Sequence, residues 1–102
     1  MATLFQRRIW QKIKLIPRGR VTTYKLLAES LGKPKASRAL ANILKKNPKL
    51  IKIPCHRVVK SNGKVGGYVK GVKTKIKLLK KEGINIEKFK IKDFKKNLFK
   101  FK

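Results

Sequence analysis

Apolar residues recur at helical spacing near the start of the chain. The stripe consists of Phe5, Ile9, Ile13 and Ile16. Arginine and lysine fill the opposite face, and Pro17 and Gly19 end the pattern. We therefore predict a first amphipathic helix, with Trp10 packing at the edge of its apolar stripe.

Two shorter apolar stripes follow. They carry Leu26, Leu27 and Leu31, and then Leu40, Ile43 and Leu44. Thr22 or Thr23 can cap the first of these helices by accepting a hydrogen bond from a free backbone N–H group, and Gly32 ends it. The second helix is predicted over about residues 36–46. Two short helices joined by a tight, glycine-containing turn are typical of a helix-turn-helix.

Short extended segments are predicted for the middle of the chain. Ile51, Ile53 and the Val58-Val59 pair are apolar, and Asn62-Gly63 is a tight-turn signal between Val59 and Val65. This pattern predicts a small hairpin. A last core helix, ended by Gly83, is predicted for the stretch that carries Val72, Ile76, Leu78 and Leu79. The elements together predict a mostly helical α+β fold of the winged helix-turn-helix type with a small hairpin.

From residue 85 onward the pattern fits neither a helix nor a strand. Large apolar residues are interleaved with lysines, namely Phe89, Ile91, Phe94, Leu98, Phe99 and Phe101. Two interpretations are open: the aromatic side chains pack on the domain, or the segment is a cationic arm for DNA or a membrane surface. We favour packing combined with non-specific attraction to phosphate.

The charge balance restricts the partners more than the fold. The chain of 102 residues has 30 Lys and Arg against 4 Asp and Glu, for a formal net charge of +26. A polyanion is the natural complement of such a chain. A compositional bias of the source organism would also enrich lysine, so charge alone does not establish a nucleic-acid partner.

The chain contains a single cysteine, Cys55, so it forms no intramolecular disulfide. A reducing compartment is the simplest setting, and we expect a cytoplasmic protein. No apolar run approaches the about 20 residues that a membrane span needs. We therefore expect no membrane partner.

Cys55 has neighbours that favour chemistry. A lone cysteine is usually a small buried hydrophobic residue. Here Pro54 fixes the backbone before it, and His56, the only histidine, and Arg57 follow it. Cationic neighbours favour the thiolate, which is the nucleophilic form. We therefore expect a reactive thiolate at Cys55.

Glu82 is one of only 4 acidic residues and closes the last predicted core helix. A carboxylate at a helix C-terminus is disfavoured by the helix dipole, so a partner is expected to compensate for it. That partner is His56 in a Cys–His–Glu relay, or a lysine in a surface salt bridge. Sequence position alone favours the salt bridge.

Several segments of the chain together resemble a known family, the O6-alkylguanine-DNA alkyltransferases, also called methylated-DNA–protein-cysteine methyltransferases. The segment from Pro54 to Val59 is similar to the family's reactive-cysteine signature. The segments 19–24 and 34–39 resemble the approach to its helix-turn-helix and the start of its recognition helix. Further matches are Asn47-Pro48, Gly63, Val65-Gly66, Tyr68 and Lys81-Glu82-Gly83. The resemblance covers about residues 3–84. Many relatives carry an additional N-terminal domain, so the resemblance is to a minimal, single-domain form or to one part of a longer protein.

The resemblance implies catalytic roles. Cys55 would accept the alkyl group and keep it, so each protein molecule would act once. His56 would take the thiol proton through a water molecule, and Glu82 would orient His56. Tyr24 would polarise the guanine leaving group and crowd its phosphate. The reaction needs no metal and no cofactor.

The resemblance also implies DNA contacts. Arg38 would enter the base stack in place of the extruded base, and Asn47 would brace the turn between the recognition helix and the active site. The DNA backbone would be bound by Lys25, Lys33 and Ser61. Backbone groups of the guanine pocket would come from Cys55, Val58 and Val69. Val69 stands where a serine is common in the family, so a side-chain contact is lost there.

The predicted function is therefore single-turnover repair of O6-alkylguanine in double-stranded DNA by a monomer. The division implied is a catalytic and DNA-binding domain over residues 1–84 and a basic extension over 85–102. One rival is a non-enzymatic lesion-binding relative, against which the presence of Cys55 argues. The other is a plain basic winged-helix DNA-binding protein, which does not explain the pairing of Cys55 with His56.

Overall fold

The computed structural model of the chain describes residues 3–47 and 52–101. The helices are α1 (Leu4–Lys14), α2 (Tyr24–Ser30), α3 (Ser37–Leu44), the 3₁₀ helix η1 (Cys55–Arg57), α4 (Val72–Lys81) and α5 (Phe94–Asn97). The strands are β1 (Thr22–Thr23), β2 (Val58–Val59), β3 (Ile86–Glu87) and β4 (Lys90–Ile91). The predicted mostly helical α+β class is confirmed, whereas the extended segment expected at Ile51 lies outside the described residues. Within the described ranges, no helix has both the length and the apolar content needed to cross a membrane.

The first helix begins with a reciprocal cap. The Thr3 hydroxyl accepts from the backbone N–H of Gln6 at 3.1 Å, and the Gln6 side chain accepts from the backbone N–H of Thr3 at 3.1 Å. Ile9 and Ile13 of the predicted stripe are buried. Trp10 is also buried and belongs to the same core cluster. The amphipathic helix predicted from the spacing is thus confirmed.

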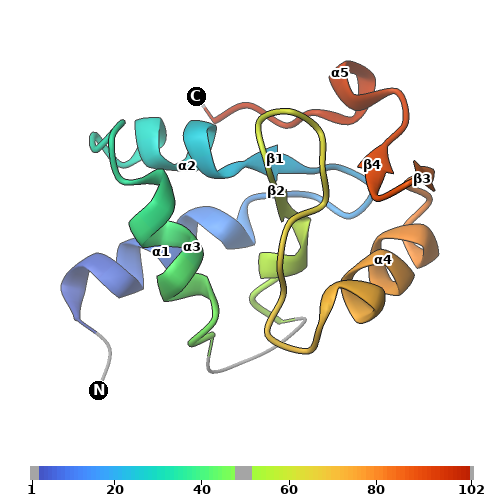
Figure 1. Cartoon of the computed structure of the whole chain (residues 1–102). Coiled ribbons are helices and arrows are strands. Elements are labelled where there is room, and N and C mark those ends of the chain that lie inside the picture. The colour runs from blue at the N-terminus through green and yellow to red at the C-terminus, as the bar shows by residue number, and fades with distance from the viewer. Residues whose placement is uncertain (1–2, 48–51, 102) are drawn as a thin grey trace.

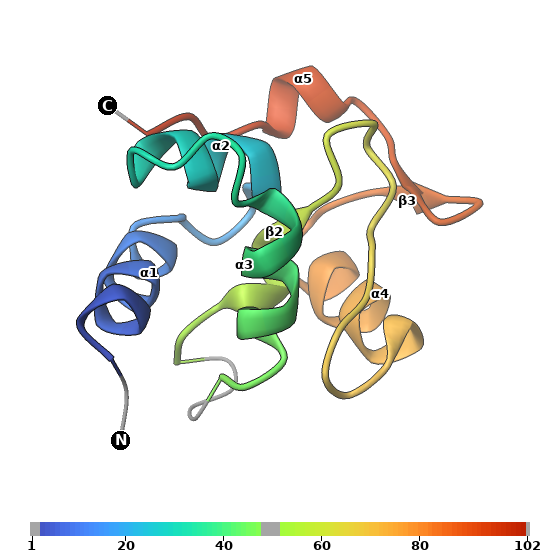
Figure 2. The ribbon, with the colours of Figure 1, turned by 60° about the vertical axis from the view of Figure 1, so that its left-hand side comes forward.

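Helices α2 and α3 form the predicted helix-turn-helix (Figure 2). Thr23 caps α2 by accepting from the backbone N–H of Leu26 at 3.0 Å. At the other end the N–H groups of Gly32 and Lys33 donate to Glu29 and Ala28, each at 3.0 Å. This pair of bonds is a Schellman motif, which requires a left-handed residue, and Gly32 supplies it with φ at +74°. Local chemistry therefore determines both ends of α2.

Strands β1 and β2 pair in parallel, with Thr22 opposite Val58 and Thr23 opposite Val59. The pairing joins segments that are distant in the chain. It sets the start of α2 beside the residues that follow the Cys55 motif, because Tyr24 directly follows β1 and η1 directly precedes β2. The sheet is short, but it positions the site.

The turn at Asn62-Gly63 forms, but it does not join the strands that the sequence suggested. The N–H of Gly63 donates to the Lys60 carbonyl at 2.9 Å, which closes the turn. Beyond it Lys64 bridges to Lys90 instead of β2, and β2 pairs with β1. The hairpin of the fold is β3–β4, with Ile86 opposite Ile91. Both β2 and Lys64 pair with segments that are distant in the sequence, and local turn chemistry cannot indicate such partners.

The segment from residue 85 to 101 packs along the body of the molecule (Figure 1). Val21 pairs with it on both sides: its N–H donates to the Asn97 carbonyl at 2.9 Å, and its carbonyl accepts from Phe99 at 2.7 Å. Phe99 and Phe101 pack against the core cluster that contains α1 and α2 residues. The prediction that the aromatic side chains pack on the domain is confirmed for Phe94, Phe99 and Phe101, whereas Phe89 is exposed.

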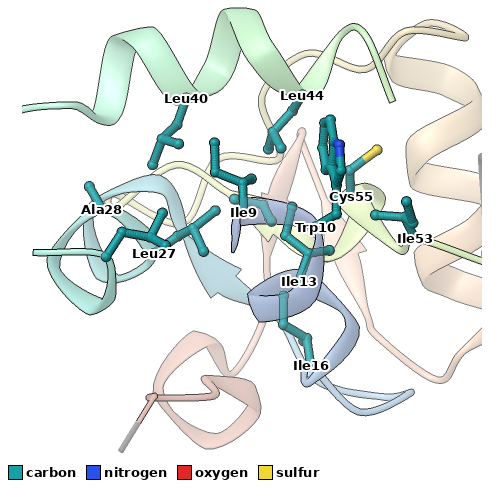
Figure 3. Packing of buried hydrophobic residues seen from close by; sticks show 12 residues of the cluster. Ile9, Trp10, Ile13, Ile16, Leu27, Ala28, Leu40, Leu44, Ile53 and Cys55 are labelled. Carbon is teal, nitrogen blue, oxygen red and sulfur yellow. The ribbon is translucent and has the colours of Figure 1, made fainter. Parts of the chain in front are cut away.

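Within residues 3–47 and 52–101, the buried apolar side chains form two clusters. The larger one joins α1, α2, α3 and the turn that carries Cys55 (Figure 3), and it includes Val58. The smaller one joins α4 to the C-terminal segment and includes Val59 and Leu79. Since neighbouring residues of a strand face opposite sides, β2 contributes Val58 to one cluster and Val59 to the other. Cys55 is therefore held by a packed core.

Candidate functional site

Cys55 is presented by a tight turn that its neighbours dictate. Pro54 has φ at −80° and ψ at 62°, and the N–H of Cys55 donates to the Ile53 carbonyl at 2.8 Å. These values describe an inverse γ-turn, for which the fixed φ of proline is suited. The N–H of Arg57 then donates to the Pro54 carbonyl at 2.9 Å and begins η1. The backbone at Cys55 is thus bonded on both sides.

Asn47 ties this turn to the end of α3. Its side-chain amide donates to the Ile53 carbonyl at 2.7 Å and to Cys55 Sγ at 3.1 Å. The same amide therefore orients the backbone before the cysteine and the sulfur itself. Pro48, which belongs to the same family match as Asn47, lies outside the described residues.

His56 and Glu82 form the polar centre of the site. His56 is fully buried, and its Nε2 lies 3.0 Å from Glu82 Oε2. Burial lowers the pKa of His56, more than the nearby carboxylate raises it. His56 is therefore neutral at neutral pH. An ionised carboxylate only accepts hydrogen bonds, so the imidazole donates from Nε2 and keeps a lone pair on Nδ1. That Nδ1 is buried and has no hydrogen-bond partner among the described residues.

Glu82 also binds Arg57 through both carboxylate oxygens. Arg57 Nε donates to Oε1 at 2.9 Å and Nη2 donates to Oε2 at 2.7 Å, while Nη1 donates to the Ile16 carbonyl at 2.8 Å. Burial by itself would raise the pKa of Glu82, but the hydrogen bonds and charges of Arg57 and His56 outweigh it and lower that pKa. The carboxylate is ionised, and the surface salt bridge with lysine that sequence position favoured is wrong.

A Schellman motif sets the place of Glu82. The N–H groups of Gly83 and Ile84 donate to Lys80 and Leu79, each at 3.0 Å, and Gly83 adopts φ of +90°. Glu82 is the C-cap residue of α4 inside this motif. Ile84 and Leu79 are both buried in the smaller cluster, which holds the helix end in place.

The expected thiolate at Cys55 is wrong for the resting protein. Burial raises the pKa of the Cys55 thiol, although the Asn47 hydrogen bond and the Lys75 charge lower it in part. The neighbouring cations do not act as the sequence suggested. His56 is neutral, and the guanidinium of Arg57 is engaged by Glu82. Cys55 is therefore a thiol that requires a base.

Lys75 is a site residue that the sequence reasoning missed. It is 0% exposed, and its Nζ donates to the carbonyls of Val58 at 2.7 Å and Gly67 at 3.1 Å. Burial lowers its pKa to about 7, partly opposed by the charge of Cys55. One signal could have found it: Lys75 lies at i+3 from Val72 and i−4 from Leu79, which is the buried face of α4.

Tyr24 stands at the first position of α2, beside the same lysine. Lys75 Nζ lies 5.8 Å from the centroid of the Tyr24 ring. Burial, together with the charge of Cys55, raises the pKa of Tyr24 to about 12. The hydroxyl is therefore a hydrogen-bond donor throughout the neutral range.

A pocket of about 160 Å³ opens beside Cys55. Tyr24, Tyr68 and Val69 line it together with Cys55. Since Cys55 is only 4% exposed and lines this hollow, the pocket is the route to the sulfur. Val58 is not among the residues that line this pocket, and its carbonyl accepts a hydrogen bond from Lys75 Nζ. The two tyrosines give the pocket the aromatic surface that suits a planar base.

A second hollow, a groove of about 440 Å³, continues from the pocket along α2 and α3. It brings together Tyr24, Lys25, Arg38 and Ser61, which the resemblance placed on DNA. Lys33 is exposed but lies apart from the groove's lining, with its Nζ 5.8 Å from the Phe5 ring centroid.

The family model of the 6-O-methylguanine DNA methyltransferase DNA-binding domain matches residues 4–84. The chain belongs to this family. It is 47% identical over 81 residues to the methylated-DNA–protein-cysteine methyltransferase of Methanosarcina acetivorans, covering 79% of this chain and 52% of that protein. It is 45% identical over 86 residues to the bifunctional transcriptional activator/DNA repair enzyme Ada of Escherichia coli, covering 84% of this chain and 24% of Ada. The chain thus spans about half the length of the curated methyltransferases that it matches.

Solved structures share the fold. Mycobacterium tuberculosis OGT in complex with DNA superposes with a TM-score of 0.79 at 38% identity, covering 81% of this chain and 51% of that one. S. pombe Atl1, in complex with damaged DNA containing O6-carboxymethylguanine, has a TM-score of 0.84 at 24% identity. This second likeness concerns the fold alone, and it covers 99% of this chain and 100% of that one. It therefore includes the C-terminal segment, which lies beyond the family match.

Proposed function

We propose that the chain repairs O6-alkylguanine in double-stranded DNA by transferring the alkyl group to Cys55 in a single turnover. The observation that carries this proposal is the buried Cys55 thiol next to a neutral His56 that Glu82 fixes through Nε2. Family membership and a DNA-bound relative of similar fold support the DNA partner. The activity is that of a methylated-DNA–protein-cysteine methyltransferase, and the acting species is a monomer.

The transfer is a displacement at a saturated carbon. The thiol proton passes through a water molecule to Nδ1 of His56, and Sγ forms a bond to the alkyl carbon while the bond from that carbon to O6 breaks. The electron pair of the broken bond stays on guanine. Tyr24 donates a hydrogen bond to that oxygen, since its hydroxyl remains protonated with a pKa of about 12. The product is a thioether, which water does not readily cleave, so the protein is consumed.

Lys75 supports the developing thiolate. Its charge acts on Cys55 and lowers the thiol pKa against the opposing effect of burial. Its two hydrogen bonds tie the backbone of β2 at Val58 to that of Gly67, which lines the pocket. We therefore assign it a positioning and electrostatic role.

The target lies inside the duplex, so the nucleotide must be rotated out of the stack. Arg38, exposed in the first turn of α3, takes the place of the extruded base. Lys25 and Ser61 bind the DNA backbone in the groove, and Lys33 binds it from the turn between α2 and α3. The backbone of Cys55, Val58 and Val69 receives the guanine.

We assign this machinery to residues 1–84, and 85–102 to a C-terminal extension. The end of the family match at residue 84 supports this division. Asn47 serves as the hinge between α3 and the cysteine turn, which its two hydrogen bonds support.

The deciding experiment is intact-protein mass spectrometry after incubation with duplex DNA that contains O6-methylguanine. We expect one methyl group per chain, located on Cys55 by peptide digestion. A Cys55→Ala variant and an undamaged duplex are the controls, and neither should give a mass change. Tight binding to the lesion with the methyl group retained on DNA would instead support the non-enzymatic lesion-binding alternative.

A further inference from the structure

The hollow that begins at Cys55 does not end at the helix-turn-helix. The pocket and the groove share Tyr24, Ala41 and Lys60 in their walls. A further groove of about 250 Å³ shares Lys25 and Ser61 with the first and is completed by the C-terminal segment. The surface is therefore continuous from the reactive sulfur to the C-terminal segment.

The C-terminal segment presents one lysine to this second groove. Leu98 and Lys100 line the groove, while Phe99 and Phe101 pack against the core. This alternation is that of an extended strand, in which successive side chains point to opposite faces. Lys100 is exposed and is held between two anchored aromatic residues.

The segment is attached too firmly to act as a loose arm. Thr22 Oγ1 donates to the Phe99 carbonyl at 2.9 Å, in addition to the two backbone bonds of Val21. The Phe99 and Phe101 rings meet edge to face at 5.1 Å between centroids, and Lys12 lies 5.7 Å from the Phe101 centroid. Lys100 therefore has a fixed backbone position relative to Thr22 and the start of α2.

The turn that carries Ser61 is fixed to the same segment. A Cβ atom built on Gly63 would lie 3.5 Å from the Phe94 ring, so Phe94 rests on that turn. Ser61, Lys25 and Lys100 thus line one groove, and Phe94 connects the turn that carries Ser61 to the C-terminal segment. Glu29 is the acidic residue in the lining of this groove, and the two lysines outweigh it.

The chemistry of the segment fits a polyanion. Residues 85–101 hold six lysines against two acidic residues. One of these lysines, Lys92, is paired with Glu87 at 3.2 Å, which leaves a net positive surface. A phosphodiester backbone that lies on Lys25 and Ser61 would meet Lys100 as the groove continues.

We propose that Lys100 binds a phosphate of duplex DNA, so that the C-terminal segment extends the DNA-binding surface beyond the helix-turn-helix. This inference rests on the proposed function for the path of the DNA along α2 and α3. It adds a contact outside residues 4–84, the range that the family match covers.

The test compares two charge reversals in the full chain, Lys100→Glu and Lys77→Glu. Lys77 is exposed in the middle of α4, which lies on the opposite side of the molecule from α2 (Figures 1 and 2). Both variants change the net charge equally. Binding to an undamaged duplex is measured by fluorescence anisotropy over a range of salt concentrations.

We expect Lys100→Glu to reduce affinity by about eightfold at 0.1 M salt and to flatten the plot of log affinity against log salt by about 0.9, as the loss of one phosphate contact requires. Lys77→Glu should leave that slope unchanged. Superimposable curves for the two variants would overturn the proposal, as would a Lys100→Glu defect that affects anionic lipid vesicles but not DNA.

The outcome is separable from that of the alkyl transfer. Undamaged DNA carries no alkyl group, so the binding measurement stands even if Cys55 is never methylated. Conversely, methylation of Cys55 with an unchanged Lys100→Glu salt slope would refute only the role of Lys100.

Discussion

His56 Nε2 lies 3.0 Å from Glu82 Oε2, although the two residues are 26 positions apart in the chain. Glu82 also holds Arg57 by two hydrogen bonds, so one carboxylate orients both neighbours of the cysteine motif. It determines which imidazole nitrogen carries the proton, and hence that Nδ1 is the one available as a base.

Replacing Glu82 by Gln should slow alkyl transfer by about 10²-fold or more, because the amide carries no charge and has one acceptor oxygen in place of the two that His56 and Arg57 use, so it sets the imidazole tautomer less firmly. It should also destabilise the fold by about 3 kcal/mol, since the Arg57 charge is left without its partner. Stopped transfer assays and urea denaturation measure the two effects. Arg57→Lys is the matched variant, which keeps Glu82 and a cation: it should lose stability but retain more of the rate. An unimpaired rate in Glu82→Gln would refute the relay.

Lys75 should make stability depend on pH in the neutral range. Its folded-state pKa is about 7, whereas an exposed lysine titrates near 10.4, so above pH 7 the unfolded chain binds one proton more than the folded chain. The unfolding free energy should therefore rise with pH between about 7 and 10.4, the folded and unfolded pKa values of Lys75, by up to about 1.4 kcal/mol per pH unit from this group. Lys75→Met should remove this component, and Lys77→Met should not. Parallel pH profiles of wild type and Lys75→Met would contradict the lowered pKa.

Arg38 should matter only when a base has to leave a duplex. We expect Arg38→Ala to transfer alkyl groups from duplex DNA at least about tenfold more slowly, since losing a few kcal/mol of support for the flipped state is enough for this effect. Transfer from free O6-alkylguanine should stay at the wild-type rate. Both transfer rates are measured by mass spectrometry of the protein. Equal slowing on the two substrates would place the defect in the pocket instead.

Gly83 should be costly to replace. Its φ of +90° is disfavoured for any residue with a Cβ atom, so Gly83→Ala should lose about 1–2 kcal/mol of stability and shift Glu82 from His56. Gly67→Ala is the matched control, because a Cβ there meets no atom within 4 Å and no left-handed φ is required. We expect that control to stay within about 0.5 kcal/mol of wild type in thermal denaturation. Equal destabilisation of both variants would argue against the Schellman motif as the anchor of Glu82.

Sequence patterns determined the features that depend on neighbours in the chain. The helical stripe with Ile9 and Ile13, a threonine cap and the Gly32 and Gly83 helix ends follow from periodicity and backbone preference, and all of them form. The sequence left Thr22 and Thr23 open as the cap, and the structure selects Thr23. The motif from Pro54 to Arg57 likewise singled out Cys55 as the candidate nucleophile, and the inverse γ-turn that presents it follows from the restricted φ of proline. Local rules act over a few residues, so a single chain suffices to apply them.

Tertiary structure decided the features that depend on the burial of a side chain and on the groups that fold against it. The sequence suggested a thiolate at Cys55, but burial raises its pKa and makes a base necessary. It favoured a surface partner for Glu82, but folding brings His56 and Arg57 to that carboxylate. Lys75 looked like one lysine among many until α4 packed it against the carbonyls of Val58 and Gly67. Local sequence thus specified which groups are present, whereas their protonation and partners depend on dielectric and long-range pairing, which exist only once the chain has folded.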